Sequence, residues 1–553
     1  MIRFIALSGT TGVTQNNYIY EYLPDGKNVS DAIIVDVGVG FPEPEMFGVD
    51  LVISDFKYIK ENKNKIRGIL ITHGHEDHLG ALPFLLDDVD VPVYASKLVA
   101  GFIEDKFKDY NKNVKINIFD PERDAISLGA FKVSPFRISH SVPDSVGFVI
   151  DTPDGALVHC ADYKFDWTPV DGRPFDISKL AMLSSNKTIA LASDCLGATT
   201  PGYTGSEREI EGRIENILKE ATGQVYLTTI SSNISRMQQT INAAAKVGRK
   251  VCFVGRSIDS KAGIARELGY LPYQDGVVVN PKRALKLNKD QILYIISGSY
   301  GQPGSALYRL IMGEHDFLSI EPGDVVVFSS DPAPPGSKAN VDFLVDKLIE
   351  AGIDVHYYDM QEDLHVSGHG SQEDIKMLIS VVKPKYLIPI GGTIRHMRAY
   401  THLAEGIGYD ARNVFELAGG ESIEFDRTGA RRGKKVEVKD ILVDGLGIGD
   451  VGNVVLRDRR VLAKEGIAIA MIQFDNVAKR IVDNPEIISR GFVFNEKQKG
   501  FLDKAGRSLA DFLRTKKTLD KRFVRDTSID FLERFFYKEI GRRPMVLPVI
   551  VEV

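Results

Sequence analysis

Four metal-binding side chains crowd into six residues of this chain, directly after an apolar run. His73, His75, Asp77 and His78 follow the apolar residues 69–71. Residues two apart on an extended segment point the same way, so the first two histidines can bind one ion together. The aspartate and the last histidine then turn toward a second ion. Imidazole and carboxylate ligands together suit zinc (Zn²⁺). The spacing therefore predicts a two-metal centre at the end of a β-strand.

Three later residues extend this centre. Asp36 ends an apolar strand, where a carboxylate can orient a ligating histidine from behind. His140 follows another strand and is a candidate third ligand for the first ion. Asp162 also ends a strand, and its two oxygens can bridge two ions. His159 and Cys160 lie inside the apolar strand before it, so we expect them to pack in the core.

Length and composition set limits on the architecture. At 553 residues the chain should form roughly two to four domains. Its 43% hydrophobic and 26% charged residues are typical of a globular protein. No apolar run approaches the ~20 residues that span a bilayer, so we expect no membrane segment. Residues 1–7 predict a short strand without a signal-peptide cleavage pattern.

The cysteines indicate the redox environment of the protein, whereas the net charge gives little information about its partners. Cys160, Cys195 and Cys252 are few and far apart, which favours reduced thiols in a cytoplasmic protein over a disulfide framework. The net charge of −6 is weak evidence, because the distribution of charge matters more than its sum. A nucleic-acid substrate would still require a locally basic groove.

The order of apolar segments predicts α/β layers followed by a second α/β domain. Short strands alternate with helices through the first part of the chain. The expected strands there are 32–37, 68–72, 92–95 and 156–159, and the expected helices are 81–86 and 97–107. A further run of βα units extends from 207 to 351 and predicts a separate doubly wound domain. From about residue 427 a basic linker leads to a small α/β unit that ends in an apolar strand.

These motifs, in this order, resemble the metallo-β-lactamase fold. Other segments narrow the resemblance to the ribonuclease J family of β-CASP nucleases, and the match spans essentially the whole chain. They are 41–46, 140–145, 193–194, 201–203, 255–257, 365–371, 444–451 and 543–548. The resemblance implies an α/β fold. A metallo-β-lactamase αββα sandwich (1–205 and 363–428) would hold an inserted β-CASP α/β domain (206–362), followed by a linker (429–464) and a small C-terminal α/β domain (465–553).

The resemblance also implies roles for individual residues. His73, His75 and His140 would bind the first zinc, Asp77 and His78 the second, and Asp162 would bridge them. Asp194 matches an acidic residue that supports the site, and His369 a histidine that contacts the scissile phosphate. Other residues fall in segments that surround the RNA 5′ end and backbone, although they could also be plain loop turns: Ser232, Asn233, Arg256, Ser257, Ser367, Gly368, Gly370 and Ser371. Glycine-rich loops expose the N–H groups that phosphate needs.

One position departs from the family. The family usually reads Pro-Val-His-Gly-Glu at its last motif, and that histidine ligates the second metal, whereas Gly391 stands in its place here. Water could fill the gap, His396 could reach back from the next helix, or the second ion could be weak or absent. We expect the second ion to be retained but more weakly bound.

Together these features predict a cytoplasmic, metal-dependent ribonuclease. Two zinc ions per chain, or manganese (Mn²⁺), would activate water for phosphodiester hydrolysis. Asp77 would accept or orient the proton, and His369 would neutralise developing charge. The expected substrate is single-stranded, 5′-monophosphorylated RNA, digested 5′ to 3′ with some endonuclease activity, by a homodimer or homotetramer. Two alternatives are an RNA-binding scaffold with weakened catalysis, suggested by Gly391, and a small-molecule hydrolase, which the inserted domain argues against.

Overall fold

The predicted ligands follow β-strands that end at one edge of a layered structure. This computed structural model describes residues 1–184, 188–331, 334–357, 360, 364–426, 428–445, 447–492, 499–516 and 519–553. They form two units. The first comprises Met1–Phe41 and Leu51–Ile441, and the second comprises Pro42–Asp50 and Leu442–Val553.

An eight-stranded mixed sheet forms the first layer of the first unit. In spatial order its strands are β20 (Gly429–Arg432), β19 (Ser422–Asp426), β1 (Ile2–Ser8), β2 (Asn17–Tyr22), β3 (Asp31–Val35), β5 (Ile66–Leu70), β6 (Val93–Ala95) and β7 (Ile116–Ile118). Strands β3, β5, β6 and β7 pair in parallel. Parallel neighbours end at the same edge of a sheet, so Asp36 and His73, just past β3 and β5, lie at one edge.

A six-stranded sheet packs against the first one. Its order is β18 (Tyr386–Ile390), β12 (Thr188–Asp194), β11 (Gly155–Cys160), β10 (Val146–Thr152), β9 (Phe131–Arg137) and β8 (Ile126–Leu128). Buried apolar side chains from both sheets, such as Phe4 and Leu70 from the first and Phe148 and Ile388 from the second, form one core between them. Removing this apolar surface from water holds the two sheets together.

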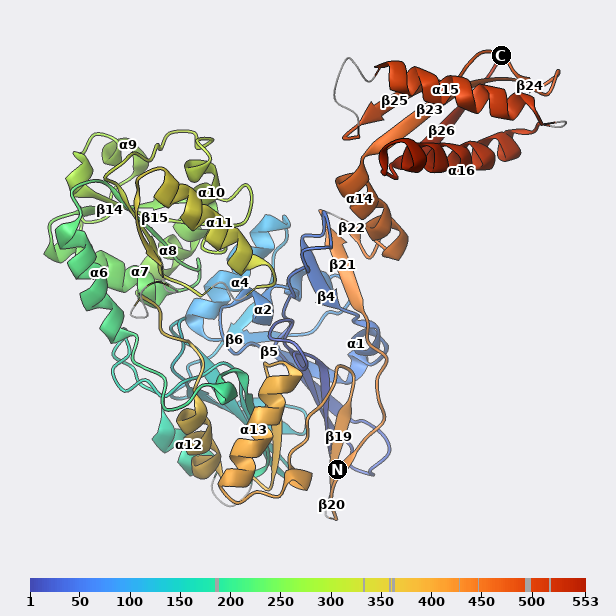
Figure 1. Cartoon of the computed structure of the whole chain (residues 1–553). Helices are drawn as coiled ribbons and strands as arrows, with labels where there is room; N and C mark the ends of the chain where they lie inside the picture. Colours follow the sequence, from blue (N-terminus) through green and yellow to red (C-terminus); the bar gives the residue numbers. More distant parts are fainter. Residues whose placement is uncertain are drawn as a thin grey trace. The chain divides into compact units, whose positions relative to one another are not determined.

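Helices cover the outer faces of the two sheets. Helices α5 (Ile177–Ser184), α12 (Gln372–Val382) and α13 (Ile394–Gly406) share a second core with the six-stranded sheet. Helix α4 (Lys97–Asp109) packs along β6 and β7 of the eight-stranded sheet. Figure 1 shows α12 and α13 next to each other on their side of the unit. The predicted αββα sandwich is confirmed.

A second α/β lobe is inserted between β12 and α12. Its five strands are all parallel, in the order β14 (Lys250–Val254), β15 (Ile292–Ile296), β13 (Val225–Thr228), β16 (Val325–Phe328) and β17 (Asp354–Tyr357). Their nearly unbroken apolar sequences are typical of strands buried on both faces. Helices α6 (Arg208–Glu220), α7 (Ile234–Lys246), α8 (Arg256–Leu268), α10 (Ala306–Ile311) and α11 (Ser337–Glu350) surround the sheet (Figure 1). The inserted α/β domain is therefore also confirmed.

A buried cluster of charges joins the sandwich to the inserted lobe. The Arg236 guanidinium, 0% exposed, donates 2.8 Å to Glu207 Oε2 and 3.1 Å to the carbonyl of Leu364. Lys164, two residues past Asp162, donates 3.2 Å to the carbonyl of Gly205 and 3.5 Å to Glu207 Oε1. The chain enters the lobe near Glu207 and leaves it near Leu364. The entry is therefore held by buried ion pairs, and the exit by a hydrogen bond from the same arginine.

The second unit is a sheet covered by helices. It contains α14 (Asn453–Glu465), β23 (Ile467–Asp475), β24 (Arg480–Ile481), β25 (Glu486–Arg490), α15 (Lys499–Arg514), α16 (Lys521–Ile540) and β26 (Met545–Glu552). Alternate residues of β23, including Ala468, Ala470 and Ile472, pack against α15 and α16 in a core of their own. This is the small α/β unit that the sequence predicts.

Two local expectations differ from the structure. The helix expected at 81–86 is present as α3 (Leu82–Leu85), but an additional short helix, α2 (Glu76–Leu79), precedes it. Helix α2 begins directly after His75, because the ligand loop must turn at once to bring Asp77 and His78 back toward the sheet edge. The stretch expected as a linker, 429–464, contains β20, β21 (Asp440–Asp444), β22 (Gly447–Ile448) and most of α14.

Candidate metal centre

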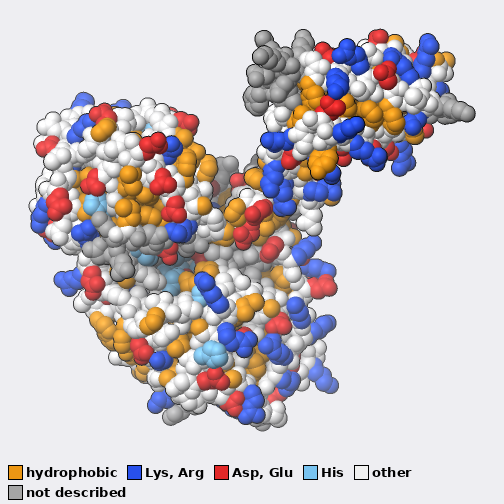
Figure 2. Space-filling view, in the orientation of Figure 1, with side chains coloured by type: hydrophobic (Ala, Val, Ile, Leu, Met, Phe, Trp, Pro, Cys, Tyr) orange, Lys and Arg blue, Asp and Glu red, His pale blue; other side chains and the backbone are white. Residues whose placement is uncertain are grey.

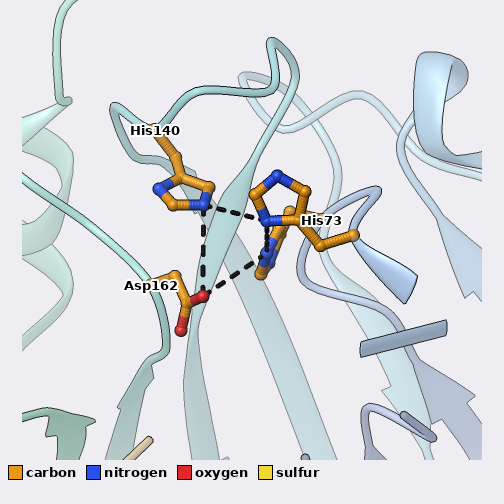
Figure 3. Close-up of side chains that lie close together, drawn as sticks. His73, His140 and Asp162 are labelled. Atoms are coloured by element: carbon orange, nitrogen blue, oxygen red, sulfur yellow. Dashed lines mark hydrogen bonds and ion pairs between the residues drawn. The ribbon is translucent and has the colours of Figure 1, made fainter. Parts of the chain in front are cut away.

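The first group of donors converges from three strand ends. His73 Nε2 lies 3.0 Å from His75 Nδ1, which lies 3.1 Å from His140 Nε2. Asp162 Oδ2 is 3.7 Å from His73 Nε2 and 4.0 Å from His140 Nε2. Figure 3 shows the rings of His73 and His140 and the carboxylate of Asp162 turned toward a common point. These four side chains could hold one ion among them.

Burial keeps these imidazoles neutral. It lowers the pKa of His73 and of His75 well below the usual value, and it lowers that of His140 to about 4. Three ring nitrogens at such distances cannot all donate protons to one another, so lone pairs face one another beside a carboxylate. A divalent cation satisfies this donor set, which has the composition of a zinc site. The residues present therefore fit a metal ion.

The outward ring atoms of the same histidines are held by other groups. His140 Nδ1 donates to the carbonyl of Gly368 at 2.8 Å, and His73 Nδ1 lies 3.0 Å from Thr72 Oγ1. His75 Nε2 lies 3.2 Å from Ser141 Oγ. Such partners fix which nitrogen faces the metal. A Cβ at Gly368 would lie 2.6 Å from the His140 ring, so this contact requires glycine.

The second group shares Asp162 with the first. His78 Nε2 lies 3.3 Å from Asp162 Oδ2 and 3.6 Å from Asp77 Oδ2. Burial lowers the pKa of His78, but the carboxylates around it outweigh burial and raise it well above the usual value. Burial raises the pKa of Asp77 to about 6. An ion bound here would have to displace the proton that these shifts favour.

Asp36 lies behind His78. Its Oδ2 accepts a hydrogen bond from His78 Nδ1 at 2.7 Å, and its two oxygens also accept from the Thr72 amide at 2.8 Å and hydroxyl at 2.7 Å. Asp36 is 0% exposed and has a φ of +61°, a conformation that aspartate tolerates better than most residues. The strand-end carboxylate therefore leaves Nε2 as the ring atom of His78 that faces the centre.

Asp194 and His369 form a pair on the other side of Asp162. His369 Nδ1 is 2.7 Å from Asp194 Oδ2, and its Nε2 is 3.9 Å from Asp162 Oδ2. Burial lowers the pKa of His369, yet the two carboxylates outweigh it and raise the pKa to about 9. This imidazole therefore carries a positive charge at neutral pH in the metal-free protein. In the view of Figure 2, histidine side chains (pale blue) are visible between the inserted lobe and the sandwich, with a basic side chain (blue) next to them.

Gly391 faces the metal centre without a side chain. A Cβ built on it would lie 3.5 Å from Asp194 Oδ1 and 3.8 Å from Asp162 Oδ1. His396 does not replace the missing side chain. Its Nδ1 lies 3.1 Å from Thr393 Oγ1 and accepts from the Thr393 amide at 3.2 Å, in a capping box at the start of α13. Within the described ranges, no group of metal donors includes His396.

The segments expected to contact RNA differ in their surroundings. Gly368 and His369 lie at the metal centre, but the amides of His369, Gly370 and Ser371 donate to Ser367 Oγ, the Tyr163 carbonyl and Thr204 Oγ1. Those N–H groups are therefore committed inside the protein. A phosphate near this loop would instead meet side chains.

The candidates in the inserted lobe have local roles as well. Asn233 is buried, and its side chain caps α7 by accepting from the Arg236 amide at 2.9 Å. Ser232 beside it is also buried. Arg256 opens α8, is exposed and lies 3.9 Å from Asp109, and Ser257 follows it in the helix. Contacts of these residues with RNA stay a prediction.

Asn16 is a residue of the centre that sequence reasoning missed. Its Nδ2 lies 2.9 Å from His78 Nε2, across 62 positions of the chain. Gly9 and Gly12 in the loop before it were the available signal, because glycine lets a backbone approach a site closely. Thr72 was also missed, although its place directly before His73 makes it a natural partner for the strand-end carboxylate.

Four family models match the chain. They are the metallo-beta-lactamase superfamily over residues 11–196, the ribonuclease J beta-CASP domain over 222–348, a Zn-dependent metallo-hydrolase RNA specificity domain over 359–414 and the ribonuclease J C-terminal domain over 454–553. Within the described ranges, no helix is long and apolar enough to cross a membrane.

Curated proteins match along their whole length. The chain is 38% identical to ribonuclease J2 of Bacillus subtilis, over 100% of this chain and 99% of that protein. It is 34% identical to ribonuclease J 1 of Streptococcus pyogenes, over 99% of this chain and 97% of that protein. A solved structure from Enterococcus faecalis, of unknown function, has a TM-score of 0.53 at 14% identity, over 76% of this chain and 99% of that one, which supports the fold alone.

Proposed function

The chain belongs to the ribonuclease J family of metal-binding RNA hydrolases, and we propose that its two donor groups bind zinc to cleave RNA from the 5′ end. The observation that carries the proposal is the convergence of His73, His75 and His140 on Asp162 in a chain of this family. Asp77 and His78 would hold a second ion, with Asp162 shared. Manganese would serve the same oxygen and nitrogen donors.

When bound, such ions polarise the phosphoryl oxygens and lower the pKa of a bound water toward ~7. The protein's own groups would do the rest. Asp77 would accept or orient the proton of the attacking water. His369, held by Asp194, would face the phosphate and neutralise the charge that develops there.

The metal proposal is tested by His75→Ala, with His402→Ala as the matched control. His402 is an exposed histidine of α13 that lies outside the donor groups. We expect His75→Ala to lose the tightly held ion. RNA turnover should then fall at least roughly 10³-fold, which is the size of effect seen when a group that stabilises the transition state is removed. Metal per chain and turnover of RNA are measured together. Unchanged turnover would contradict the catalytic proposal and favour a scaffold role.

Direction of cleavage and end preference need separate substrates. We propose 5′-to-3′ digestion of single-stranded RNA that carries a 5′-monophosphate, with weaker endonuclease activity. The imidazole of His369, held by Asp194 at 2.7 Å and 3.9 Å from the shared Asp162 carboxylate, supports a phosphate at this place. The experiment compares one RNA with a 5′-monophosphate, a 5′-triphosphate or a 5′-hydroxyl, together with its circular form. Equal rates on all three ends, or faster cleavage of the circle, would contradict the proposal.

We also propose that the second unit forms dimers or tetramers. On the sheet face opposite α15 and α16, the exposed residues Met471, Ile488, Leu547 and Val549 form an apolar patch. Such a patch on a β-sheet is typical of an interface. We expect light scattering at micromolar concentration to give a dimer or tetramer and Val549→Lys to weaken it. A monomeric wild-type protein would contradict this proposal.

A further inference from the structure

Asn16 lies against Asp77 and His78, two of the three ligands of the second donor group, but the proposed mechanism does not use it. It is 1% exposed and directly precedes β2. Its Nδ2 lies 2.9 Å from His78 Nε2 and 3.3 Å from Asp77 Oδ2. Because Asp36 holds the other ring nitrogen of His78, Nε2 is the atom that meets an ion. The Asn16 amide therefore lies where an ion would meet His78.

The backbone fixes Asn16 in this place. Its amide donates to the carbonyl of Asp77 at 2.9 Å, and its carbonyl accepts from the Gly38 amide at 2.9 Å. Gly38 has no room for a side chain, since a Cβ there would lie 1.6 Å from the Asp77 carbonyl oxygen. The segment is therefore too closely packed for Asn16 to move away when an ion binds. Only the side-chain amide can adjust.

The spacing of the atoms suits four ligands of one ion. Ligands at 2.0–2.1 Å in a tetrahedron lie roughly 3.3–3.4 Å from one another. Here the terminal atom of Asn16 is 2.9 Å from His78 Nε2 and 3.3 Å from Asp77 Oδ2. His78 Nε2 is in turn 3.6 Å from Asp77 Oδ2 and 3.3 Å from Asp162 Oδ2. Asn16 thus adds a fourth position to a group that otherwise has three.

The neighbouring tyrosine permits either orientation of the amide. The Tyr18 hydroxyl lies 2.9 Å from the Gly9 carbonyl and 2.7 Å from Asn16 Oδ1, but it has one proton to give. If the amide turns by half a revolution, Tyr18 donates to Gly9 and accepts from Asn16 Nδ2. Asn16 Oδ1 then faces His78 and Asp77, and the ion takes the place of the 3.2 Å hydrogen bond from Nδ2 to the Asp77 carbonyl. An amide oxygen is a donor atom that divalent ions accept.

We propose that Asn16 Oδ1 is the fourth protein ligand of the second ion and compensates for the missing side chain at Gly391. This proposal rests on the proposed function, because it requires the metal centre to bind ions. The two positions are physically linked, since the Gly391 amide donates to the Gly9 carbonyl at 2.9 Å and Gly9 also contacts Tyr18. The loop that leads to Asn16 is therefore hydrogen-bonded to the strand end at Gly391.

The test is competitive Zn²⁺ titration of the full chain against a chromophoric chelator, which resolves two sites per chain. Asn16→Ala should weaken the second site at least roughly tenfold and leave the first unchanged. Asn16→Asp separates two roles. A carboxylate is a better ligand than an amide oxygen, so a ligand role predicts tighter second-site binding, whereas a residue that only donates a hydrogen bond to His78 predicts weaker binding.

Asn17→Ala is the matched control. Asn17 is also an asparagine at the start of β2 and is 1% exposed, but its side-chain amide has no hydrogen-bond partner within the described ranges. It should leave both sites unchanged, and near-ultraviolet circular dichroism should show all variants folded. Weaker second-site binding in Asn16→Asp, or no change in Asn16→Ala, would overturn the ligand role. A wild-type chain without a first site would instead overturn the proposed function itself.

Discussion

The metal centre and the cluster around Arg236 both bury charge, but they satisfy it differently. At Arg236 each buried anion has a cation from the same chain, because Glu207 lies 2.8 Å from the guanidinium and 3.5 Å from Lys164. At the metal centre, neutral histidines turn lone pairs toward one another and toward a carboxylate. The first arrangement is complete within the protein, and the second is completed by a cation from solution.

This difference separates the two tasks of the first unit. The Arg236 cluster lies where the chain passes between the sandwich and the inserted lobe, so it fixes the lobe independently of metal. The metal centre lies at the strand ends beside it, with Lys164 only two residues beyond Asp162. Substitutions in the Arg236 cluster should therefore lower folding stability more than metal content. Substitutions in the metal centre should lower metal content more than folding stability.

Arg236→Met should produce the largest loss of stability. It leaves Glu207 buried with Lys164 as its remaining cation, and removing one partner of a buried pair costs about 3–5 kcal/mol. Urea denaturation measures the free energy of unfolding, and zinc per chain should stay unchanged in the folded fraction. The double variant Arg236→Met with Glu207→Leu should recover more than half of the loss. Equal losses in both variants would show that the unpaired charge is not the cause.

Acid should weaken the same cluster. Burial raises the pKa of Glu207, but Arg236 and Lys164 outweigh it and hold the pKa at about 2, against 4.5 for a free glutamate. A group whose pKa is lower in the folded than in the unfolded chain stabilises the fold above pH 4.5, and this stabilisation is lost as the pH falls toward 2. The difference between the two pKa values of Glu207 corresponds to roughly 3 kcal/mol of folding free energy. Urea midpoints between pH 7 and pH 2.5 should therefore fall more steeply for wild type than for the double variant.

Removing the metal should destabilise the protein through the metal centre and not through the Arg236 cluster. Ions that bind only the folded chain stabilise it by about 2.7 kcal/mol at one hundred times their dissociation constant. We therefore expect the thermal midpoint to fall when a chelator is added and to recover with zinc. The Arg236→Met variant should lose the same increment, since its metal centre is intact. A midpoint independent of metal would contradict the view that this centre is completed by a cation.

The two regions also differ in how far the sequence predicts them. The ligands of the centre could be predicted because His73, His75 and His78 are close in sequence and His140 and Asp162 follow strands. The Arg236 cluster could not, because an arginine in a helix is usually exposed and nothing local indicates burial. Its contacts join residues 29 and 128 positions apart, which only the folded chain brings together.

The same limit applies inside the metal centre. The resemblance to the family located Gly391, and the structure shows that a side chain there would face Asp162 and Asp194. It could not locate Asn16, since asparagine before a strand is common and its partner His78 is 62 positions away. Local spacing thus predicts ligands that share a loop. Residues that complete the centre from other loops depend on tertiary packing.

Asp36→Asn should produce the smallest of these effects. Asparagine keeps the size of the side chain and tolerates the φ of +61°, but it offers His78 Nδ1 a weaker acceptor than a carboxylate. Replacing such a partner typically lowers metal affinity 10–100-fold, or about 1.4–2.7 kcal/mol. Zinc titration should show this loss at the second site. Asp144→Asn is the matched control, because Asp144 also has a positive φ, +65°, and accepts from Leu98 and Tyr270 rather than from a ligand. Equal second-site affinity in the two variants would show that His78 is oriented by packing and not by the Asp36 carboxylate.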